Sequence, residues 1–255
     1  MKKPHRILLF MLPLLILACG KEGSDQSENP DRFDPTGNIT LLYLAADNNL
    51  QSAYAFGTEN LNQIEAAIPA NPKKKIIAYF DYPGTGGAKL YYVTHDTDES
   101  TINSRVLKEY GKVNSCHPDM LKQALTDANE AIPGYKVSDL VLWSHGTGWL
   151  PGTAYAATGS ITAAYTTADT PAELSFGADD SASGAQMDIR DLTAVLQPFG
   201  LTRIYFDACC MSCIEVAYEM KDCADYIVAS PAEILGTGYP YRAITGYLTE
   251  KETDP

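Results

Sequence analysis

Short, continuous apolar runs constrain the fold of this chain more than any other feature of its sequence. They recur at residues 39–44, 75–80, 140–143, 201–206 and 226–229. Runs that are continuous, and not alternating, are typical of strands buried on both faces of a parallel sheet. Helical apolar spacing is found between and after them, at residues 50–68, 118–131, 187–196, 213–223 and 241–248. This order predicts an α/β domain with three layers and a mostly parallel sheet.

One long segment departs from this alternation. From Gly146 to Gln186 the chain is rich in Gly, Ala, Ser and Thr, and its apolar residues show weak periodicity. We expect a long irregular excursion there, of the kind that forms functional loops or is poorly ordered. A shorter apolar stretch, Leu90–Thr94, is predicted to be the second arm of a hairpin.

The N-terminal residues have the layout of an export signal. Three basic residues precede an apolar run from Ile7 to Leu17, which is too short to span a bilayer as a helix. The run ends in Ala18-Cys19-Gly20, which resembles a bacterial lipoprotein signal. We expect residues 1–18 to be removed and Cys19 to be acylated, so that the protein is exported and held on a bacterial membrane. Display on the cell surface is one form that this anchoring can take. A plain secretory signal is the alternative.

Residues 19–37 are acidic and almost free of large apolar side chains, so they are predicted to be a flexible tether. The folded domain is expected to cover residues 38–255. The net charge of the chain is -13, which excludes a basic surface for nucleic acid. If Cys19 is acylated, an odd number of cysteines remains, and this predicts at least one free thiol.

Two of the predicted strands end in reactive side chains. His145 follows the run at 140–143, and Cys209 follows the run at 201–206. Ligands of open α/β sheets bind at the carboxyl ends of the strands, so the two residues meet if the strands are neighbours. A thiol with a nearby imidazole is a nucleophile with its proton-transfer partner. The helix predicted after Cys209 would further favour a thiolate, and the absence of a side chain at Gly146 leaves room for a backbone N–H to meet an oxyanion.

Three sequence blocks in the same order resemble the clostripain-like cysteine peptidases of the caspase–gingipain superfamily. They are residues 43–50, residues 142–149 and Asp207-Ala208-Cys209. The resemblance covers about residues 38–248. It implies a caspase-like sheet and an endopeptidase that acts on peptides or proteins with a Cys209–His145 dyad. It also implies backbone oxyanion donors at Gly146 and Cys209, and an acidic Asp207 beside the pocket for the P1 residue.

The resemblance has three departures. Relatives commonly cleave after Arg or Lys and often carry an acidic residue at the position of Thr237, so Asp207 and Glu233 remain as sources of negative charge. No Lys or Arg occurs from Gly146 to Ile189, where relatives cut themselves after a basic residue. The chain ends at Pro255, whereas relatives usually continue with more sheet, which is consistent with a truncated domain.

Two other functions stay open. Cys210-Met211-Ser212-Cys213 has the spacing of a thiol–disulfide oxidoreductase, although that function explains only two residues. A surface-binding lipoprotein on the same fold, without catalysis, is the other. No motif requires a metal or cofactor. Some relatives use calcium, but carboxylates such as Asp179 and Asp180 are too common to predict it. We expect a monomer.

Overall fold

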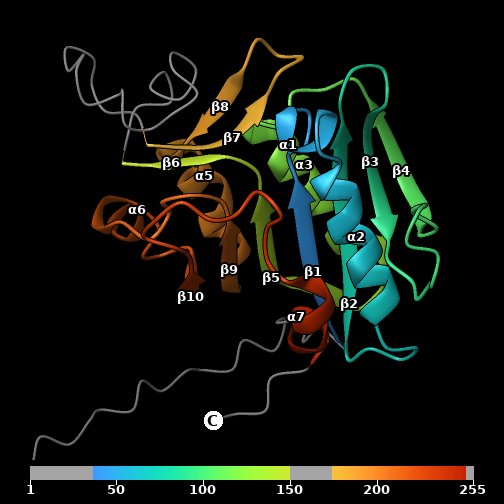
Figure 1. Ribbon diagram of the computed structural model, residues 1–255. Helices are drawn as coiled ribbons and strands as arrows, with labels where there is room; N and C mark the ends of the chain where they lie inside the picture. The colour runs from blue at the N-terminus through green and yellow to red at the C-terminus, as the bar shows by residue number, and fades with distance from the viewer. Residues whose placement is uncertain (1–36, 150–173, 251–255) are drawn as a thin grey trace, which may run out of the picture. The chain divides into compact units, whose positions relative to one another are not determined.

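The computed structural model describes residues 37–149 and 174–250 (Figure 1). The predicted signal, Cys19 and nearly all of the predicted tether lie outside the described residues, as do residues 150–173. Within the described ranges, no helix is both long and apolar enough to cross a membrane. All described residues belong to one unit, which spans Pro35–Pro255.

A seven-stranded sheet, in the order β10-β9-β5-β1-β2-β3-β4, forms the centre of this unit (Figure 1). Its strands are β1 (Gly37–Leu44), β2 (Lys74–Tyr82), β3 (Gly87–Tyr92), β4 (Arg105–Gly111), β5 (Tyr135–Trp143), β9 (Leu201–Asp207) and β10 (Ala224–Val228). The five strands from β10 to β2 are parallel, and β3 and β4 continue the sheet in antiparallel pairing. The predicted mostly parallel sheet is therefore confirmed.

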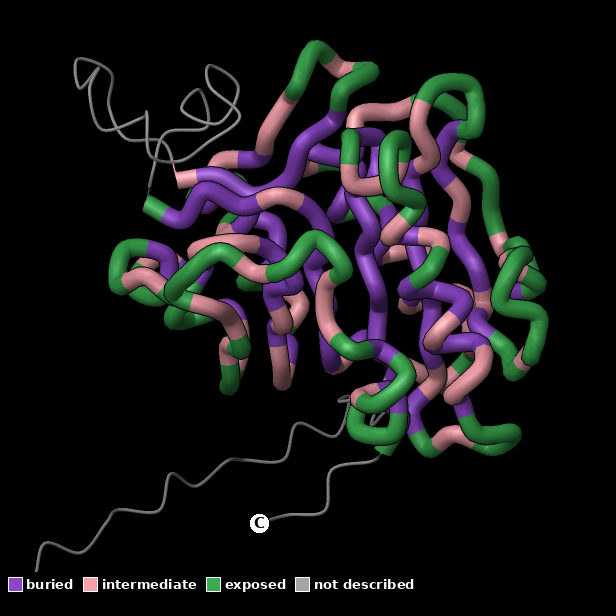
Figure 2. The backbone as a smooth tube through the Cα atoms, viewed as in Figure 1, coloured by how far each residue is buried: buried purple, intermediate pink, exposed green. Residues whose placement is uncertain are grey.

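Helices cover both faces of the sheet. One face packs against α3 (Pro118–Ala131), α5 (Ile189–Leu196) and α6 (Ile214–Glu219), and the other against α2 (Phe56–Ala67) and α7 (Tyr241–Thr249). Strand β1 serves both layers, because Leu41 and Tyr43 join the first cluster while Leu42 and Leu44 join the second. The buried backbone in Figure 2 follows these central strands. The three-layer prediction is confirmed.

A second sheet lies where an irregular excursion was expected. It is antiparallel and consists of β6 (Gly146–Gly148), β7 (Ser175–Asp179) and β8 (Ala185–Asp188). The prediction is wrong for these residues, because small polar side chains are paired and buried here. Thr147 and Ser175, for example, share a 2.8 Å hydrogen bond between their hydroxyl groups.

Other boundaries differ for local reasons. Strand β4 was missed because its side chains are mostly exposed and polar at the edge of the sheet. The helix predicted at 50–68 is divided into α1 (Asn49–Ser52) and α2, since Ala55 between them adopts a left-handed φ of 56°. The helix predicted at 213–223 is limited to α6. The short 3-10 turn Gln197–Phe199 follows α5 directly.

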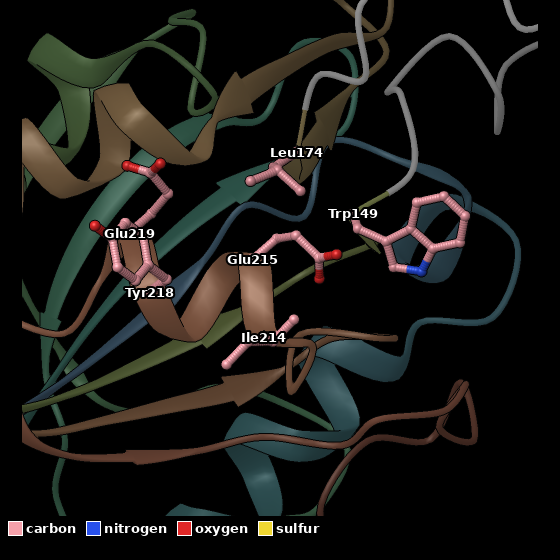
Figure 3. Close-up of a pocket in the computed structure, with 6 residues that line it drawn as sticks. All are labelled: Trp149, Leu174, Ile214, Glu215, Tyr218 and Glu219. Carbon is pink, nitrogen blue, oxygen red and sulfur yellow. The ribbon is translucent and has the colours of Figure 1, made fainter.

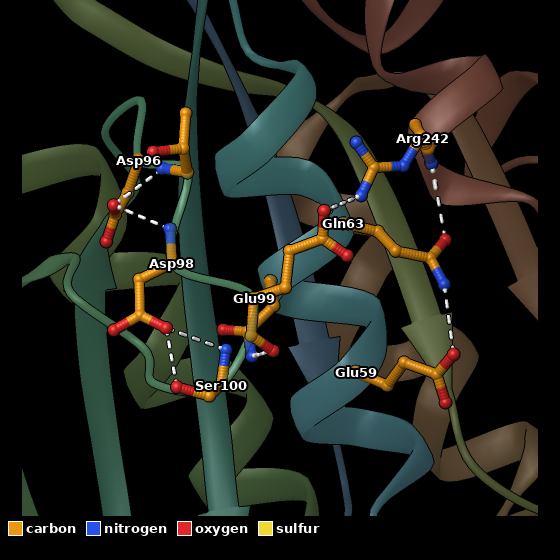
Figure 4. A network of polar contacts seen from close by, with 9 residues as sticks. Glu59, Gln63, Asp96, Asp98, Glu99, Ser100 and Arg242 are labelled. Atoms are coloured by element: carbon orange, nitrogen blue, oxygen red, sulfur yellow. Dashed lines mark hydrogen bonds and ion pairs between the residues drawn. The ribbon is translucent and has the colours of Figure 1, made fainter.

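Helix α7 is held by apolar and polar contacts against α2 and by an ion pair to the loop between β3 and β4. Leu248 belongs to the cluster that also contains Leu61 and Ile64 of α2. Arg242 forms a 2.7 Å ion pair with Glu99, and its backbone N–H donates to Gln63 (Figure 4). These contacts position the chain segment that precedes α7, which runs along the carboxyl ends of the strands described next.

Candidate active site

His145 and Cys209 both follow strands that are neighbours in the sheet. β5 and β9 pair in parallel, with Trp143 opposite Asp207. The pairing is continued beyond the strands by a 3.3 Å hydrogen bond from Ser144 N to Asp207 O. The strands are thus neighbours, which is the condition under which the sequence brings the two residues together, and both residues leave the sheet at the carboxyl ends of the strands.

The chain after His145 runs directly against the turn that contains Cys209. A Cβ atom added to Gly146 would lie 2.7 Å from the carbonyl oxygen of Cys209 and 2.9 Å from Met211 Sδ. Gly148, with a φ of +59°, makes a similar close approach to the backbone of Cys210. These glycines thus permit two loops to pack backbone to backbone, which adds a packing role to the one that the sequence suggested for Gly146.

The thiol of Cys209 is half-buried against the loop that follows β10. Ile234 N donates to Cys209 Sγ at 3.4 Å, and the thiol donates to Ile234 O at 3.9 Å. Burial raises the pKa of Cys209, and the negative charges of Glu233 and Asp207 act in the same direction. The expected contribution of a helix start is absent from this turn, because α6 begins only at Ile214 with Cys213 as its N-cap. The sequence-based expectation of a thiolate is therefore not supported.

The imidazole of His145 is hydrogen-bonded to the side chain of the first residue of α1. His145 Nε2 and Asn49 Oδ1 are 2.7 Å apart. Burial lowers the pKa of His145 to about 4, so the ring is neutral at physiological pH. A neutral imidazole at the same end of the sheet as a protonated thiol is suited to general-base catalysis, in which the ring accepts the proton as sulfur attacks.

Asp207 lies at the end of β9, where only 2% of its surface is exposed. Its Oδ2 accepts hydrogen bonds from Tyr239 N at 3.1 Å and from the Tyr241 hydroxyl at 2.7 Å. Its Oδ1 finds no partner among the described residues. Burial raises the pKa of Asp207 to about 6, and the two hydrogen bonds oppose that shift.

Glu233 and Thr237 both lie on the loop between β10 and α7, and both are exposed. Glu233 neighbours Ile234, the residue that contacts the Cys209 thiol. The Thr237 carbonyl accepts a 2.9 Å hydrogen bond from Asn60 Nδ2. This loop also approaches Asp207 closely, because a Cβ at Gly238 would lie 2.6 Å from Asp207 Oδ2. The structure therefore places Glu233 and Thr237 on one loop, and this loop packs against Asp207 at the end of β9 and against the Cys209 thiol.

Sequence reasoning missed the asparagines that hold these loops. Asn60 accepts a 2.9 Å hydrogen bond from Trp143 Nε1 and so connects α2 to β5 as well as to Thr237. Asn48 caps α1 and donates to Ser144 Oγ, next to His145. The pair Asn48-Asn49 after the first strand was visible in the sequence, but it is equally typical of a turn.

The remaining cysteines are unbridged thiols in the part of the chain that the structure describes. Burial raises the pKa of both Cys210 and Cys213, which disfavours the thiolates that disulfide exchange requires. No three His, Cys, Asp or Glu side chains of the described ranges cluster so that they could hold a metal ion.

A pocket of about 480 Å³ opens on the α6 side of this edge (Figure 3). Its lining combines apolar and acidic side chains: Trp149, Leu174, Ile214, Glu215, Tyr218 and Glu219. It contains none of the predicted site residues.

Comparisons with known proteins agree with this fold. A model of the clostripain family, Peptidase C11, matches residues 42–255. A secreted C11 cysteine protease from Bacteroides thetaiotaomicron, solved with an irreversible peptide inhibitor, is 29% identical with a TM-score of 0.65, and the match covers 85% of this chain and 55% of that chain. An inactive zymogen C11 protease from Parabacteroides distasonis is 32% identical with a TM-score of 0.64, covering 85% and 54%. The chain thus spans little more than half the length of these two structures. A search of curated proteins gave no match.

Proposed function

The chain belongs to the clostripain family of cysteine peptidases, and from this premise we propose that it hydrolyses peptide bonds with Cys209 as nucleophile and His145 as proton-transfer partner. The observation that carries the proposal is the parallel pairing of β5 with β9, which brings both residues to one edge of the sheet. The close packing of Gly146 against the Cys209 backbone supports the same assignment. The B. thetaiotaomicron relative was solved with a peptide inhibitor, which is consistent with a peptide substrate.

The proposed reaction begins with a neutral pair. The thiol of Cys209 transfers its proton to the imidazole as the sulfur attacks the carbonyl carbon of the scissile bond. The backbone N–H groups of Gly146 and Cys209 would stabilise the negative charge on the carbonyl oxygen. The imidazolium then protonates the leaving amine, and water hydrolyses the resulting thioester, which restores the thiol and the free carboxylate.

We propose cleavage after Arg or Lys, with Asp207 as the main source of negative charge. One oxygen of this buried carboxylate accepts two hydrogen bonds, while Oδ1 finds no partner among the described residues. Leaving a buried acceptor unpaired costs free energy. A guanidinium or ammonium group of the substrate would supply both the missing donor and the opposite charge. Glu233, exposed beside Cys209, would add to the negative potential, while Thr237 would contact the substrate through a neutral side chain.

The decisive experiment is an assay on a peptide library randomised at the P1 position, with a variant that lacks residues 1–26. Wild type, Cys209→Ala, His145→Ala and the matched control Cys210→Ala are compared under reducing conditions. We expect cleavage after Lys and Arg in the wild type and in Cys210→Ala only. No cleavage by a folded wild type would contradict the proposal and favour a binding-only protein, and equal loss in Cys210→Ala would contradict the assignment of Cys209.

We also propose that the protein is exported and anchored through acylated Cys19, as a monomer. The B. thetaiotaomicron relative is described as secreted, which is consistent with export. In a detergent phase-separation experiment with the full chain, we expect wild type in the detergent phase and Cys19→Ala in the aqueous phase. The same distribution for both would contradict the lipid anchor.

A further inference from the structure

Asn49 and His145 are joined by a short contact between elements that are far apart in the sequence. Asn49 Oδ1 lies 2.7 Å from His145 Nε2. An amide oxygen only accepts, so a hydrogen bond in this orientation requires Nε2 to carry a proton. In a neutral imidazole, the lone pair is then on Nδ1. The contact therefore selects one tautomer as well as one ring orientation.

The backbone on both sides of this contact is held by one hydrogen-bond network. Asn48 Nδ2 donates to Ala45 O at 2.8 Å, to Ser144 Oγ at 3.2 Å and to Ala178 O at 3.2 Å. Ser144 Oγ in turn donates to Ala45 O at 2.8 Å. Asn48 is only 1% exposed and Ser144 only 4%, so these bonds are shielded from water.

The network connects the residues that precede the two partners. Asn48 precedes Asn49, and its Oδ1 accepts from Leu50 N, which starts α1 at Asn49. Ser144 precedes His145, and Gly177 N donates to His145 O at 2.9 Å. Buried contacts thus set the distance between the Asn49 and His145 backbones. The two side chains themselves meet at a more exposed position than the buried network of Asn48 and Ser144.

We infer that Asn49 is a positioning residue that holds the His145 imidazole in the Nε2–H tautomer, with Nδ1 as the base for the Cys209 thiol. The inference rests on the proposed function. A carboxamide suits this role because it orients the ring without the negative charge that would stabilise an imidazolium. A carboxylate at this position would hold the ring equally well but would favour its protonated form.

The test compares Asn49→Ala and Asn49→Asp in the full chain with Gln51→Ala as the control. Gln51 belongs to the same helix α1 but hydrogen-bonds to Thr58, so its replacement perturbs α1 without removing the His145 contact. We expect Asn49→Ala to lower kcat about 10- to 100-fold with little change in KM, because binding is kept while the base is misoriented. We expect Gln51→Ala to stay within about twofold of wild type.

The ¹⁵N chemical shifts of His145 provide a readout that does not depend on activity. We expect Nε2–H in the wild type, a mixture of tautomers in Asn49→Ala, and a higher imidazole pKa in Asn49→Asp. Equal kcat in wild type and Asn49→Ala, or equal losses in Asn49→Ala and Gln51→Ala, would overturn the inference. If the wild type does not cleave peptides, the proposed function fails, and the ¹⁵N chemical shifts alone test the positioning role of Asn49. An unchanged tautomer in Asn49→Ala then overturns that role, and a changed tautomer supports it.

Discussion

The hydroxyl group of Tyr241 donates a 2.7 Å hydrogen bond to the carboxylate of Asp207. Tyr241 begins α7 and is fully buried, while Asp207 ends the strand that leads to Cys209. The bond therefore connects the helix layer on one face of the sheet to the carboxyl end of β9, next to the proposed nucleophile. It also occupies one oxygen of the carboxylate, while Oδ1 has no hydrogen-bond partner among the described residues.

Tyr241→Phe tests the stability of this connection. Removing the hydroxyl leaves a buried carboxylate with one donor fewer, so we expect the free energy of unfolding at pH 8 to fall by about 1–3 kcal/mol. The loss should be smaller at pH 5, where Asp207, with a pKa of about 6, is mostly protonated. Urea denaturation at both pH values measures this. Tyr247→Phe is the control, because Tyr247 is 79% exposed, and an equal loss in both variants would contradict the prediction.

The charge of Asp207 predicts a pH dependence that is specific to basic substrates. Its pKa of about 6 means that the carboxylate loses its charge as the pH falls below 6, whereas His145, with a pKa of about 4, stays neutral there. We expect kcat/KM for a P1 Arg peptide to fall by up to about tenfold per pH unit below pH 6. The kcat/KM for a P1 norleucine peptide should not show this fall below pH 6, and neither should the kcat/KM of Asp207→Asn for the P1 Arg peptide. The same fall for both peptides in the wild type would contradict a role of Asp207 in binding the cation.

The reactivity of Cys209 tests whether the resting pair is neutral. Burial raises the pKa of Cys209 above its usual value and lowers that of His145. We therefore expect the rate of alkylation by iodoacetamide to rise steadily with pH into the alkaline range, with a similar curve in His145→Ala. Mass spectrometry would confirm that Cys209 is the residue modified. A plateau between pH 5 and 8 that disappears in His145→Ala would instead indicate a thiolate–imidazolium pair.

Gly146→Ala tests the close packing of the two loops. The added Cβ would lie 2.7 Å from the Cys209 carbonyl oxygen, so the backbones must separate and Cys209 must move. We expect kcat/KM to fall about 100-fold, the effect expected of a displacement of about 1 Å at a reacting group. Gly246→Ala in α7 is the matched control, because its Cβ would meet nothing within 4 Å. Activity of Gly146→Ala within twofold of wild type would show that the loops can adjust.

Asp81→Asn tests a carboxyl group whose ionised form is destabilised by its surroundings. Asp81 is 2% exposed, and burial, followed by the charge of Asp179, raises its pKa to about 7. The pKa of Asp81 is higher in the folded state than in the unfolded state. Its contribution to the free energy of unfolding is therefore largest below about pH 4 and decreases as the pH rises to about 7. We expect Asp81→Asn to raise the Tm at pH 8 by about 3 °C or more and to weaken its pH dependence. A lower Tm at pH 8 would contradict this, and Asp225→Asn at an exposed position of β10 serves as the control.

Which elements could be predicted depended on how they are buried. Strands such as β1 and β5 were recognised because burial on both faces leaves an uninterrupted apolar run. Strand β4 was missed because its exposed edge position requires no such run. Strand β7 was missed for the opposite reason, since its burial is achieved with small and polar residues whose hydrogen bonds are made only in the folded state.

The sequence by itself determined the fold class and singled out the pair that we propose to be reactive, because apolar periodicity is local and because His145 and Cys209 each come two residues after the end of a strand. Only the tertiary structure decided how that pair is ionised and held. The pKa shifts of Cys209 and His145 arise from burial, and the Asn49 contact joins residues that are distant along the chain. Desolvation and long-range hydrogen bonds depend on which segments pack together, and no pattern of neighbouring residues records that.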